Sequence, residues 1–221
     1  MTDEEILRRV DHTLLQATAT MDRIRVLCDE AKTHRVASVC IPPSYVRPVF
    51  DEYGSDPVIC TVIGFPLGYS VTVAKALETE RAVRDGASEI DMVINIGDVK
   101  NGRFDAVLEE IKTVRGACSG KILKVIVETC YLDEAEKTRL CGLVTEAGAD
   151  FIKTSTGFGT AGATIADIVL FRRHIGAGVR IKAAGGIKTR EDLRAFIEAG
   201  ADRIGTSSAV SLLSGGTAGR Y

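Results

Sequence analysis

Three segments that lie far apart in the chain share one short pattern. Residues 85–91 read Asp-Gly-Ala-Ser-Glu-Ile-Asp, residues 147–153 read Ala-Gly-Ala-Asp-Phe-Ile-Lys, and residues 199–205 read Ala-Gly-Ala-Asp-Arg-Ile-Gly. In each segment, glycine follows the last turn of a predicted helix, and an acidic or polar residue opens the next apolar run. Recurrence of one helix-to-strand joint at such separations favours a closed (β/α)8 barrel over an open sheet.

The rest of the chain alternates short β-branched runs with longer amphipathic stretches. Strands are predicted at residues 10–14, 37–41, 58–65, 88–96, 123–128, 150–155, 180–184 and 203–206. Helices are predicted at residues 19–33, 45–53, 71–85, 104–117, 133–146, 164–174 and 189–199. This alternation is typical of a parallel sheet with helical crossovers. Because no linker interrupts it, we expect one domain over residues 1–221, with a flexible tail at about 214–221.

Composition excludes several classes of function. A net charge of −2 and the absence of Trp give no basis for nucleic-acid binding. No stretch approaches ~20 uninterrupted apolar residues, and the acidic N-terminus lacks the features of a secretory signal, so we expect no membrane span and no export. The six cysteines form no C-x-x-C, and the three histidines share no ligand spacing. This pattern favours a reduced, cytoplasmic setting without a metal site.

Two lysines occupy positions where a strand should be hydrophobic. Lys153 lies in the run Phe-Ile-Lys-Thr-Ser-Thr-Gly, and Lys182 lies in the run Arg-Ile-Lys-Ala-Ala-Gly-Gly. A buried ammonium group is costly to desolvate, so folding alone does not explain two of them. Side chains alternate along a strand, and the outer face of a barrel must be apolar to meet the helices. We therefore expect Lys153 and Lys182 to point inward, together with Asp91 and Lys124.

This group of residues is suited to Schiff-base chemistry. Two ammonium groups in one cavity are expected to lower each other's pKa, and a neutral lysine attacks a carbonyl carbon to form an iminium. The iminium withdraws electrons, so a neighbouring carbon–carbon bond breaks or forms. Asp91 would keep Lys182 charged and relay protons. The alternative is that Lys153, Lys182 and Asp91 form a structural layer of ion pairs.

A second signal is a set of small residues where the last three predicted strands end. The set consists of Gly157, Gly185, Gly186, Gly205, Ser207 and Ser208. Such strand ends expose backbone N–H groups, and barrels often hold a phosphate after strands seven and eight. The alternative is that the glycines only form tight turns. Asp11, in the first predicted strand, either reaches the same cavity or serves as a cap or a rim hydrogen-bond partner.

Five segments of the sequence resemble the 2-deoxyribose-5-phosphate aldolase family. They are Asp91-Met92-Val93-Ile94-Asn95-Ile96-Gly97, Lys124-Val125-Ile126-Val127-Glu128-Thr129, Lys153-Thr154-Ser155-Thr156-Gly157-Phe158, Lys182-Ala183-Ala184-Gly185-Gly186 and Gly205-Thr206-Ser207-Ser208. The likeness covers nearly the whole chain. It implies a class I aldolase on a (β/α)8 barrel that uses no cofactor. It also implies interconversion of 2-deoxy-D-ribose 5-phosphate with D-glyceraldehyde 3-phosphate and acetaldehyde, a step of deoxynucleoside catabolism.

The resemblance also implies roles for individual residues. Lys153 would be the Schiff-base lysine, Lys182 would lower its pKa and relay protons, and Asp91 would be the acid/base residue. Lys124 and Asp11 match supporting positions in the substrate pocket. The phosphate-binding positions match Gly157, Gly185, Gly186, Gly205, Ser207 and Ser208.

Tyr221 and two departures from the family pattern complete the resemblance. Members of the family often end in a tyrosine on a mobile tail that assists proton transfer, which Tyr221 matches; the alternative is a terminus without function. Pro42 stands where many members carry Asn, which leaves the shape of the second loop open. Phe158 stands where one branch has a phosphate-contacting lysine, which implies that backbone groups and serines hold the phosphate here.

Two other functions fit the same residues. One is a different phosphate-binding barrel aldolase or synthase that shares the Schiff-base lysine but not the substrate. The other is a barrel that binds phosphosugars without catalysis. As partners we expect phosphosugar and aldehyde substrates, no nucleic acid and no membrane. We also expect a homo-oligomer, either a dimer or a tetramer.

Overall fold

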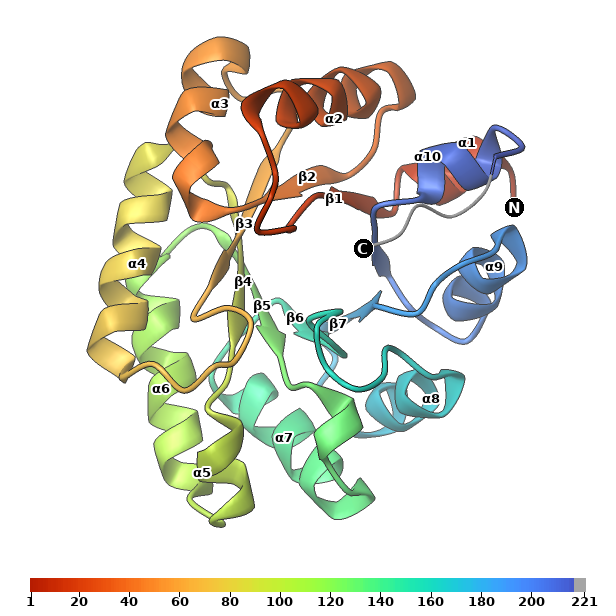
Figure 1. Cartoon of the computed structure of the whole chain (residues 1–221). Helices are drawn as coiled ribbons and strands as arrows, with labels where there is room; N and C mark the ends of the chain where they lie inside the picture. Colours follow the sequence, from red (N-terminus) through yellow and green to blue (C-terminus); the bar gives the residue numbers. More distant parts are fainter. Residues whose placement is uncertain (217–221) are drawn as a thin grey trace.

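The computed structural model describes residues 1–216, which form a closed barrel of parallel strands (Figure 1). The strands are β1 (Val10–Thr13), β2 (Ser38–Ile41), β3 (Ile59–Ile63), β4 (Glu89–Val93), β5 (Ile122–Ile126), β6 (Phe151–Lys153), β7 (Arg180–Ala184) and β8 (Arg203–Thr206). Strands consecutive in sequence pair with each other, and β1 closes the ring with β8, where Val10 lies opposite Ile204. The predicted (β/α)8 barrel is confirmed.

Helices follow the strands and surround the barrel (Figure 1). They are α1 (Asp3–Leu7), α2 (Met21–His34), α3 (Val46–Tyr53), α4 (Thr72–Asp85), α5 (Ile96–Lys100), α6 (Phe104–Ala117), α7 (Glu134–Glu146), α8 (Ile165–His174), α9 (Arg190–Glu198) and α10 (Ala209–Leu213). Short 3-10 helices, η1 (Pro43–Tyr45) and η2 (Thr129–Tyr131), precede α3 and α7. Within residues 1–216, no helix combines the length and the apolar character needed to cross a bilayer.

Local sequence signals explain where helices begin and end. Asp133 starts α7 through a capping box: its carboxylate accepts the N–H of Glu136 at 2.8 Å, and the Glu136 carboxylate accepts the N–H of Asp133 at 2.9 Å. Gly86 ends α4 with a φ of 118°, as the recurrent glycine joint predicts. A Cβ on Gly86 would lie 2.4 Å from the ring of Phe50, so packing against α3 also requires glycine there.

The main hydrophobic core lies between the strands and the helices. Ile90 and Met92 of β4 and Val125 of β5 are fully buried, and they belong to one cluster with Val107 and Ile111 of α6. Burial of these side chains supplies the hydrophobic free energy that holds the helices on the barrel. The alternate strand positions face the barrel interior, where the charged residues lie.

Four strands, β3, β4, β5 and β6, end two or three residues before their predicted ends. The strand predicted at residues 88–96 ends at Val93, because the backbone N–H of Asn95 donates to the Glu110 carboxylate of α6 at 2.9 Å instead of continuing the sheet. The strand predicted at 58–65 ends at Ile63, and the N–H of Gly64 donates to Glu78 of α4 at 2.8 Å. The sequence pattern misses α1, α5 and α10, because each of these helices has only five residues, too few to show a helical periodicity. The tail predicted at about 214–221 falls mainly on residues outside the described part, and so does Tyr221.

Candidate active site

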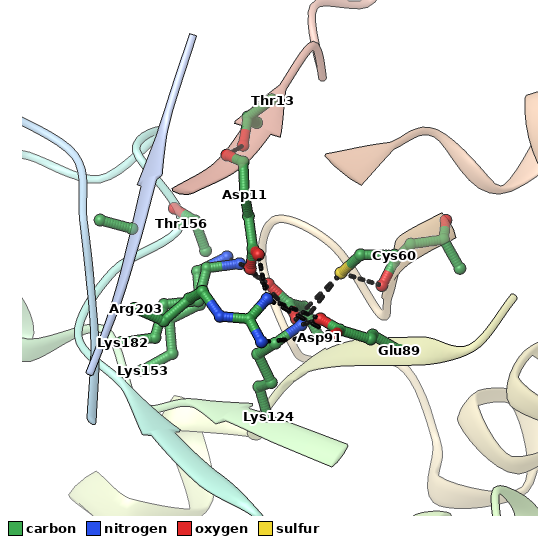
Figure 2. A network of polar contacts seen from close by, with 12 residues as sticks. Asp11, Thr13, Cys60, Glu89, Asp91, Lys124, Lys153, Thr156, Lys182 and Arg203 are labelled. Carbon is green, nitrogen blue, oxygen red and sulfur yellow. Dashed lines mark hydrogen bonds and ion pairs between the residues drawn. The ribbon is translucent and has the colours of Figure 1, made fainter. Parts of the chain in front are cut away.

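The barrel interior holds a buried cluster of charged side chains (Figure 2). Asp91 of β4, Lys124 of β5, Lys153 of β6 and Lys182 of β7 are each at most 3% exposed. In the register of the sheet, Asp91 lies opposite Lys124, and Lys153 lies opposite Lys182. The inward orientation that strand alternation predicts for these four residues is confirmed.

The Asp91 carboxylate is the centre of this cluster. Its Oδ2 accepts hydrogen bonds from Lys153 Nζ at 2.8 Å and from Lys182 Nζ at 2.7 Å, and its Oδ1 accepts from Lys124 Nζ at 2.8 Å. Burial by itself raises the pKa of a carboxyl group. Here the charges of the three lysines outweigh burial and hold the pKa of Asp91 well below its ordinary value. Asp91 is therefore ionised beside all three ammonium groups.

Two further carboxylates and an arginine extend the cluster. Asp11 of β1 pairs with Lys182 at 2.5 Å and with Arg203 of β8 at 2.5 Å. Glu89 of β4 pairs with Lys124 at 2.6 Å and with Arg203 at 3.3 Å. Over residues 1–216, these interior ion pairs join four cationic side chains to three carboxylates. The cluster thus has one excess positive charge when every member is ionised.

The surroundings of Lys182 raise its pKa, in line with the expectation that Asp91 keeps this lysine charged. Burial lowers the pKa of a lysine, but the carboxylates of Asp11 and Asp91 outweigh both burial and the repulsion from Lys124, so the pKa of Lys182 is raised. Asp11 supplies a second counter-charge at Lys182, in addition to the predicted one from Asp91. Lys182 therefore remains an ammonium group.

The same interior contains ligand atoms of the kinds that bind metals. Two groups of three lie close enough together, Cys40 with Cys60 and Asp91, and Asp11 with Cys60 and Glu89. The ammonium nitrogen of Lys124 contacts members of both groups, at 2.6 Å from Glu89, 2.8 Å from Asp91 and 3.3 Å from Cys60. A divalent ion would face this charge at short range in a buried site. The donor set therefore fits an ammonium group better than a metal ion.

The loops after β6 and β7 pack backbone against backbone. Gly157, Gly185 and Gly186 have φ angles of 89°, 77° and 75°, in the region that favours glycine. A Cβ on Gly162 would lie 2.3 Å from the carbonyl group of Gly185, so the two loops touch only with glycine there. These predicted phosphate-binding glycines follow the strands that carry Lys153 and Lys182, and the structure brings them together.

The remaining members of the predicted phosphate set lie on β8 and after it. Ser207 is partly exposed, whereas Ser208 is 3% exposed, and its N–H donates to Thr206 Oγ1 at 3.1 Å. Gly205 differs, because it lies within β8 beside Lys182. A Cβ on Gly205 would lie 3.0 Å from Lys182 Cε, closer than side chains ordinarily pack. Gly205 therefore makes room for the Lys182 side chain inside the barrel.

The two positions that depart from the family pattern both lie at the barrel mouth. Phe158 packs edge-to-face on Phe65, with ring centroids 5.3 Å apart. A cavity of about 380 Å³ has Phe158 and Glu128 in its lining. A second cavity, of about 260 Å³, is lined by Phe65, Phe158 and Pro42 among others. Pro42 precedes η1, so the second loop turns at once into a short helix.

Sequence reasoning missed three residues of this region. Glu89 and Arg203 share the inward parity of Asp91 and Gly205, so strand alternation carried a signal that could have found them. Glu128 carried a weaker signal, since it follows a strand and its importance depends on a backbone conformation that the sequence does not reveal.

Comparisons with known proteins agree with this geometry. The model of the DeoC/LacD family aldolases matches residues 6–220. A deoxyribose-phosphate aldolase of Clostridium botulinum (strain Alaska E43 / Type E3) is 59% identical over 97% of both chains. One of Clostridioides difficile (strain 630) is 55% identical over 95% of this chain and 96% of the relative.

Solved structures give the same result. A crystal structure described as a putative deoxyribose-phosphate aldolase from Coccidioides immitis superposes with a TM-score of 0.93 at 39% identity, covering 97% of this chain and 87% of that one. The deoxyribose phosphate aldolase from Aeropyrum pernix, described as a unique tetramer, gives 0.89 at 33% identity, with 96% and 91% covered. Fold and relatives define a barrel enzyme of the aldolase class. More particularly, the chain belongs to the DeoC/LacD aldolase family.

Proposed function

We propose that this chain is a class I aldolase that reversibly cleaves 2-deoxy-D-ribose 5-phosphate to D-glyceraldehyde 3-phosphate and acetaldehyde. One observation carries the proposal: Lys153 and Lys182 both donate to Oδ2 of Asp91 in a buried site. This geometry brings together a nucleophile (Lys153), a protonated lysine (Lys182) and a carboxylate that accepts protons (Asp91). Relatives at 54–59% identity named deoxyribose-phosphate aldolase support the choice of substrate.

In the proposed reaction, Lys153 is the nucleophile. Its neutral amine attacks C1 of the open-chain sugar, and loss of water gives an iminium. A base then removes the proton of the C3 hydroxyl, the C2–C3 bond breaks, and its electron pair moves to the iminium to form an enamine. Glyceraldehyde 3-phosphate leaves. Protonation at C2 and attack of water on the resulting iminium release acetaldehyde and restore Lys153.

The charge of the cluster supports these roles. Lys182 keeps its proton because Asp11 and Asp91 raise its pKa, so it is suited to donate a hydrogen bond and to hold a positive charge beside Lys153. When Lys153 gives up its proton, the remaining three cations balance the three carboxylates of the cluster. Asp91 contacts both lysines and is proposed to pass protons between them and the substrate.

The phosphate is proposed to bind at the ends of β6, β7 and β8. Backbone N–H groups of Gly157, Gly185 and Gly186 and the hydroxyl groups of Ser207 and Ser208 are the proposed phosphate-binding groups. This location is the usual phosphate site of (β/α)8 barrels. Tyr221, by resemblance to the family, is proposed to assist proton transfer at the methyl carbon derived from acetaldehyde.

We further propose that the chain acts as a single domain in a homo-oligomer, either a dimer or a tetramer. A tetrameric relative supports this state. Exposed apolar side chains also support it: Leu67, Tyr69, Val71, Val73 and Leu77 are each at least 55% exposed. A reduced cytoplasmic setting is proposed because all six cysteines are free thiols.

Borohydride trapping tests the function. Incubation with acetaldehyde or deoxyribose 5-phosphate and borohydride should reduce the iminium and leave an adduct on Lys153, which peptide mass spectrometry locates. Lys153→Leu should abolish both the adduct and cleavage, whereas Lys32→Leu on the outer helix α2 should change neither. Phosphosugar binding without an adduct would indicate a binding protein instead. An adduct formed only with a longer keto acid would indicate a different barrel aldolase.

A further inference from the structure

Glu128 has an unusual backbone conformation at the barrel mouth. It follows β5 with φ and ψ of 57° and 68°, in the left-handed region that favours glycine. Within residues 1–216, the other non-glycine residue with a positive φ is Arg35, which ends α2 at an exposed position. Strain of this kind persists where surrounding contacts impose it, and it clusters at functional sites.

The contacts of Glu128 are directed at the loop that follows β6. Its carboxylate, in a residue only 2% exposed, accepts the N–H of Thr156 at 3.2 and 3.3 Å, and it also accepts a short hydrogen bond from the Thr156 hydroxyl. The hydroxyl oxygen in turn accepts the N–H of Phe158 at 3.0 Å. A Cβ on Gly159 would lie 3.2 Å from Glu128 Cδ, so the loop packs directly on the carboxyl group. One carboxylate thus holds residues 156–159 together.

The loop that Glu128 holds is part of the proposed active site. It begins three residues after Lys153 and contains Gly157, one of the proposed phosphate-binding glycines. The backbone adds a second link, since the N–H of Thr129 donates to the carbonyl of Thr154 at 2.9 Å. Glu128 and Thr156 also line the cavity of about 380 Å³ at the mouth. With the phosphate bound at Gly157 as proposed, the position of this loop sets where the sugar meets Lys153.

We propose that Glu128 is a positioning residue for the aldolase reaction, whose carboxylate fixes the loop after Lys153 through the amide and hydroxyl of Thr156. The proposal rests on the proposed function. Glu128 acts through Thr156 and Gly157 and does not need to touch the reacting atoms. The left-handed backbone of Glu128 directs its carboxylate from the end of β5 toward the loop that follows β6. Misplacement of a substrate by about 1 Å reduces turnover by about 100-fold.

Three variants test the role. Glu128→Gly accommodates the positive φ but removes the carboxylate, and it should lower kcat/KM for deoxyribose 5-phosphate by about 100-fold, largely through kcat. Glu128→Gln keeps an acceptor oxygen for Thr156 and should return kcat/KM to within about tenfold of the wild-type value. Arg35→Gly relieves the other left-handed residue and should leave kinetics unchanged. Equal losses in the Gln and Gly variants would overturn the hydrogen-bonding account.

A double-mutant cycle with Thr156→Val completes the test. Because both residues act through one contact, the double variant should be about as slow as Glu128→Gly alone. Additive losses, or a folded Glu128→Gly enzyme within about twofold of wild-type kcat/KM, would overturn the proposal. If Glu128→Gly does not fold, Thr156→Val alone tests the proposal. A loss of kcat/KM below about twofold in this variant would overturn the positioning role of Glu128. Borohydride trapping on the wild type distinguishes failure of the positioning role from failure of the proposed function. Absence of a Lys153 adduct overturns the proposed function itself.

Discussion

Lys153 and Lys182 lie opposite each other on β6 and β7, and their ammonium groups donate to the same oxygen, Oδ2 of Asp91, at 2.8 and 2.7 Å. Two cations this close repel each other, and a carboxylate between them offsets this repulsion. Asp91 supplies that charge, and Asp11 adds a second carboxylate at Lys182, whereas the ion pair of Lys153 among residues 1–216 is the one with Asp91. The two lysines therefore differ in their electrostatic surroundings although they share a register position.

Asp91→Asn should separate the electrostatic role of this residue from its shape. The substitution keeps the side-chain volume but leaves three buried ammonium groups without their shared carboxylate. We expect kcat to fall by about 10²–10⁴-fold and the free energy of unfolding to fall by about 3–5 kcal/mol. Steady-state kinetics and urea unfolding measure the two effects. Activity within tenfold of wild type would remove Asp91 from the proton path.

Acid should destabilise the fold through the same carboxylates. Burial opposes ionisation of Asp91 and Asp11, but the lysines and Arg203 outweigh it and lower both pKa values in the folded state. The resulting stability is present above about pH 4 and is lost as pH falls below it, because there the unfolded chain binds protons that the folded chain does not. Burial raises the pKa of Glu110 and Glu128. These two groups therefore change the stability in the opposite direction, since the folded chain takes up protons there before the unfolded chain does.

Urea unfolding between pH 7 and pH 3 measures this balance. Between pH 7 and about pH 5, proton uptake by the two buried glutamates should hold stability level or raise it slightly, and below about pH 4 stability should fall steeply. The Asp91→Asn variant should show a smaller loss over the acidic range. An equal loss in the variant would show that other carboxylates dominate acid unfolding.

The barrel and its inward lysines were predictable because two strong regularities determine them. Alternation along β4 to β7 assigns Asp91, Lys124, Lys153 and Lys182 to one face, and an apolar outer face is required for the helices. The charge balance was not predictable, because the approach of Asp11 to Lys182 depends on how the barrel closes between β8 and β1. For the same reason, the contribution of Asp11 to the raised pKa of Lys182 emerges only from the assembled cluster.

Gly205→Ala should test whether Gly205 serves the lysine or the phosphate. The new Cβ would lie 3.0 Å from Lys182 Cε, so the ammonium group must shift. We expect kcat to fall by about 10–100-fold with KM for deoxyribose 5-phosphate nearly unchanged. A rise in KM with kcat unchanged would instead support phosphate binding. Gly142→Ala on α7, where a Cβ meets nothing within 4 Å, should leave activity unchanged and stabilise the protein by about 0.5–1 kcal/mol.

Deletion of Tyr221 should slow turnover and the exchange of solvent protons into acetaldehyde without altering the fold. The expected loss is about 10²-fold, the usual contribution of one acid/base group. Deuterium incorporation followed by NMR measures the exchange, and circular dichroism checks the fold. Tyr221→Phe is the matched variant, because it retains the ring and removes only the hydroxyl group. Unchanged exchange in both variants would leave the terminal tyrosine without a catalytic role.

Lys75→Met should reveal how strongly a second buried ion pair supports the mouth of the barrel. Lys75 Nζ donates to Glu110 at 2.7 Å, to the Val93 carbonyl at 2.8 Å and to the Gly68 carbonyl at 2.5 Å, and the residue is fully buried. It thereby ties the loop after β3 to the end of β4, the strand that carries Asp91. Loss of the lysine leaves Glu110 buried without its partner, which should cost about 3–5 kcal/mol of stability.

Two further variants show whether that cost arises from the unpaired charge. Glu110→Gln added to Lys75→Met removes the uncompensated carboxylate but keeps an acceptor for the N–H of Asn95, so it should recover part of the lost stability. Lys112→Met breaks only exposed ion pairs on α6 and should change stability by less than about 1 kcal/mol. Urea unfolding of the three variants measures these differences. If the double variant is no more stable than Lys75→Met, the loss comes from the broken carbonyl contacts of Lys75 rather than from the charge of Glu110.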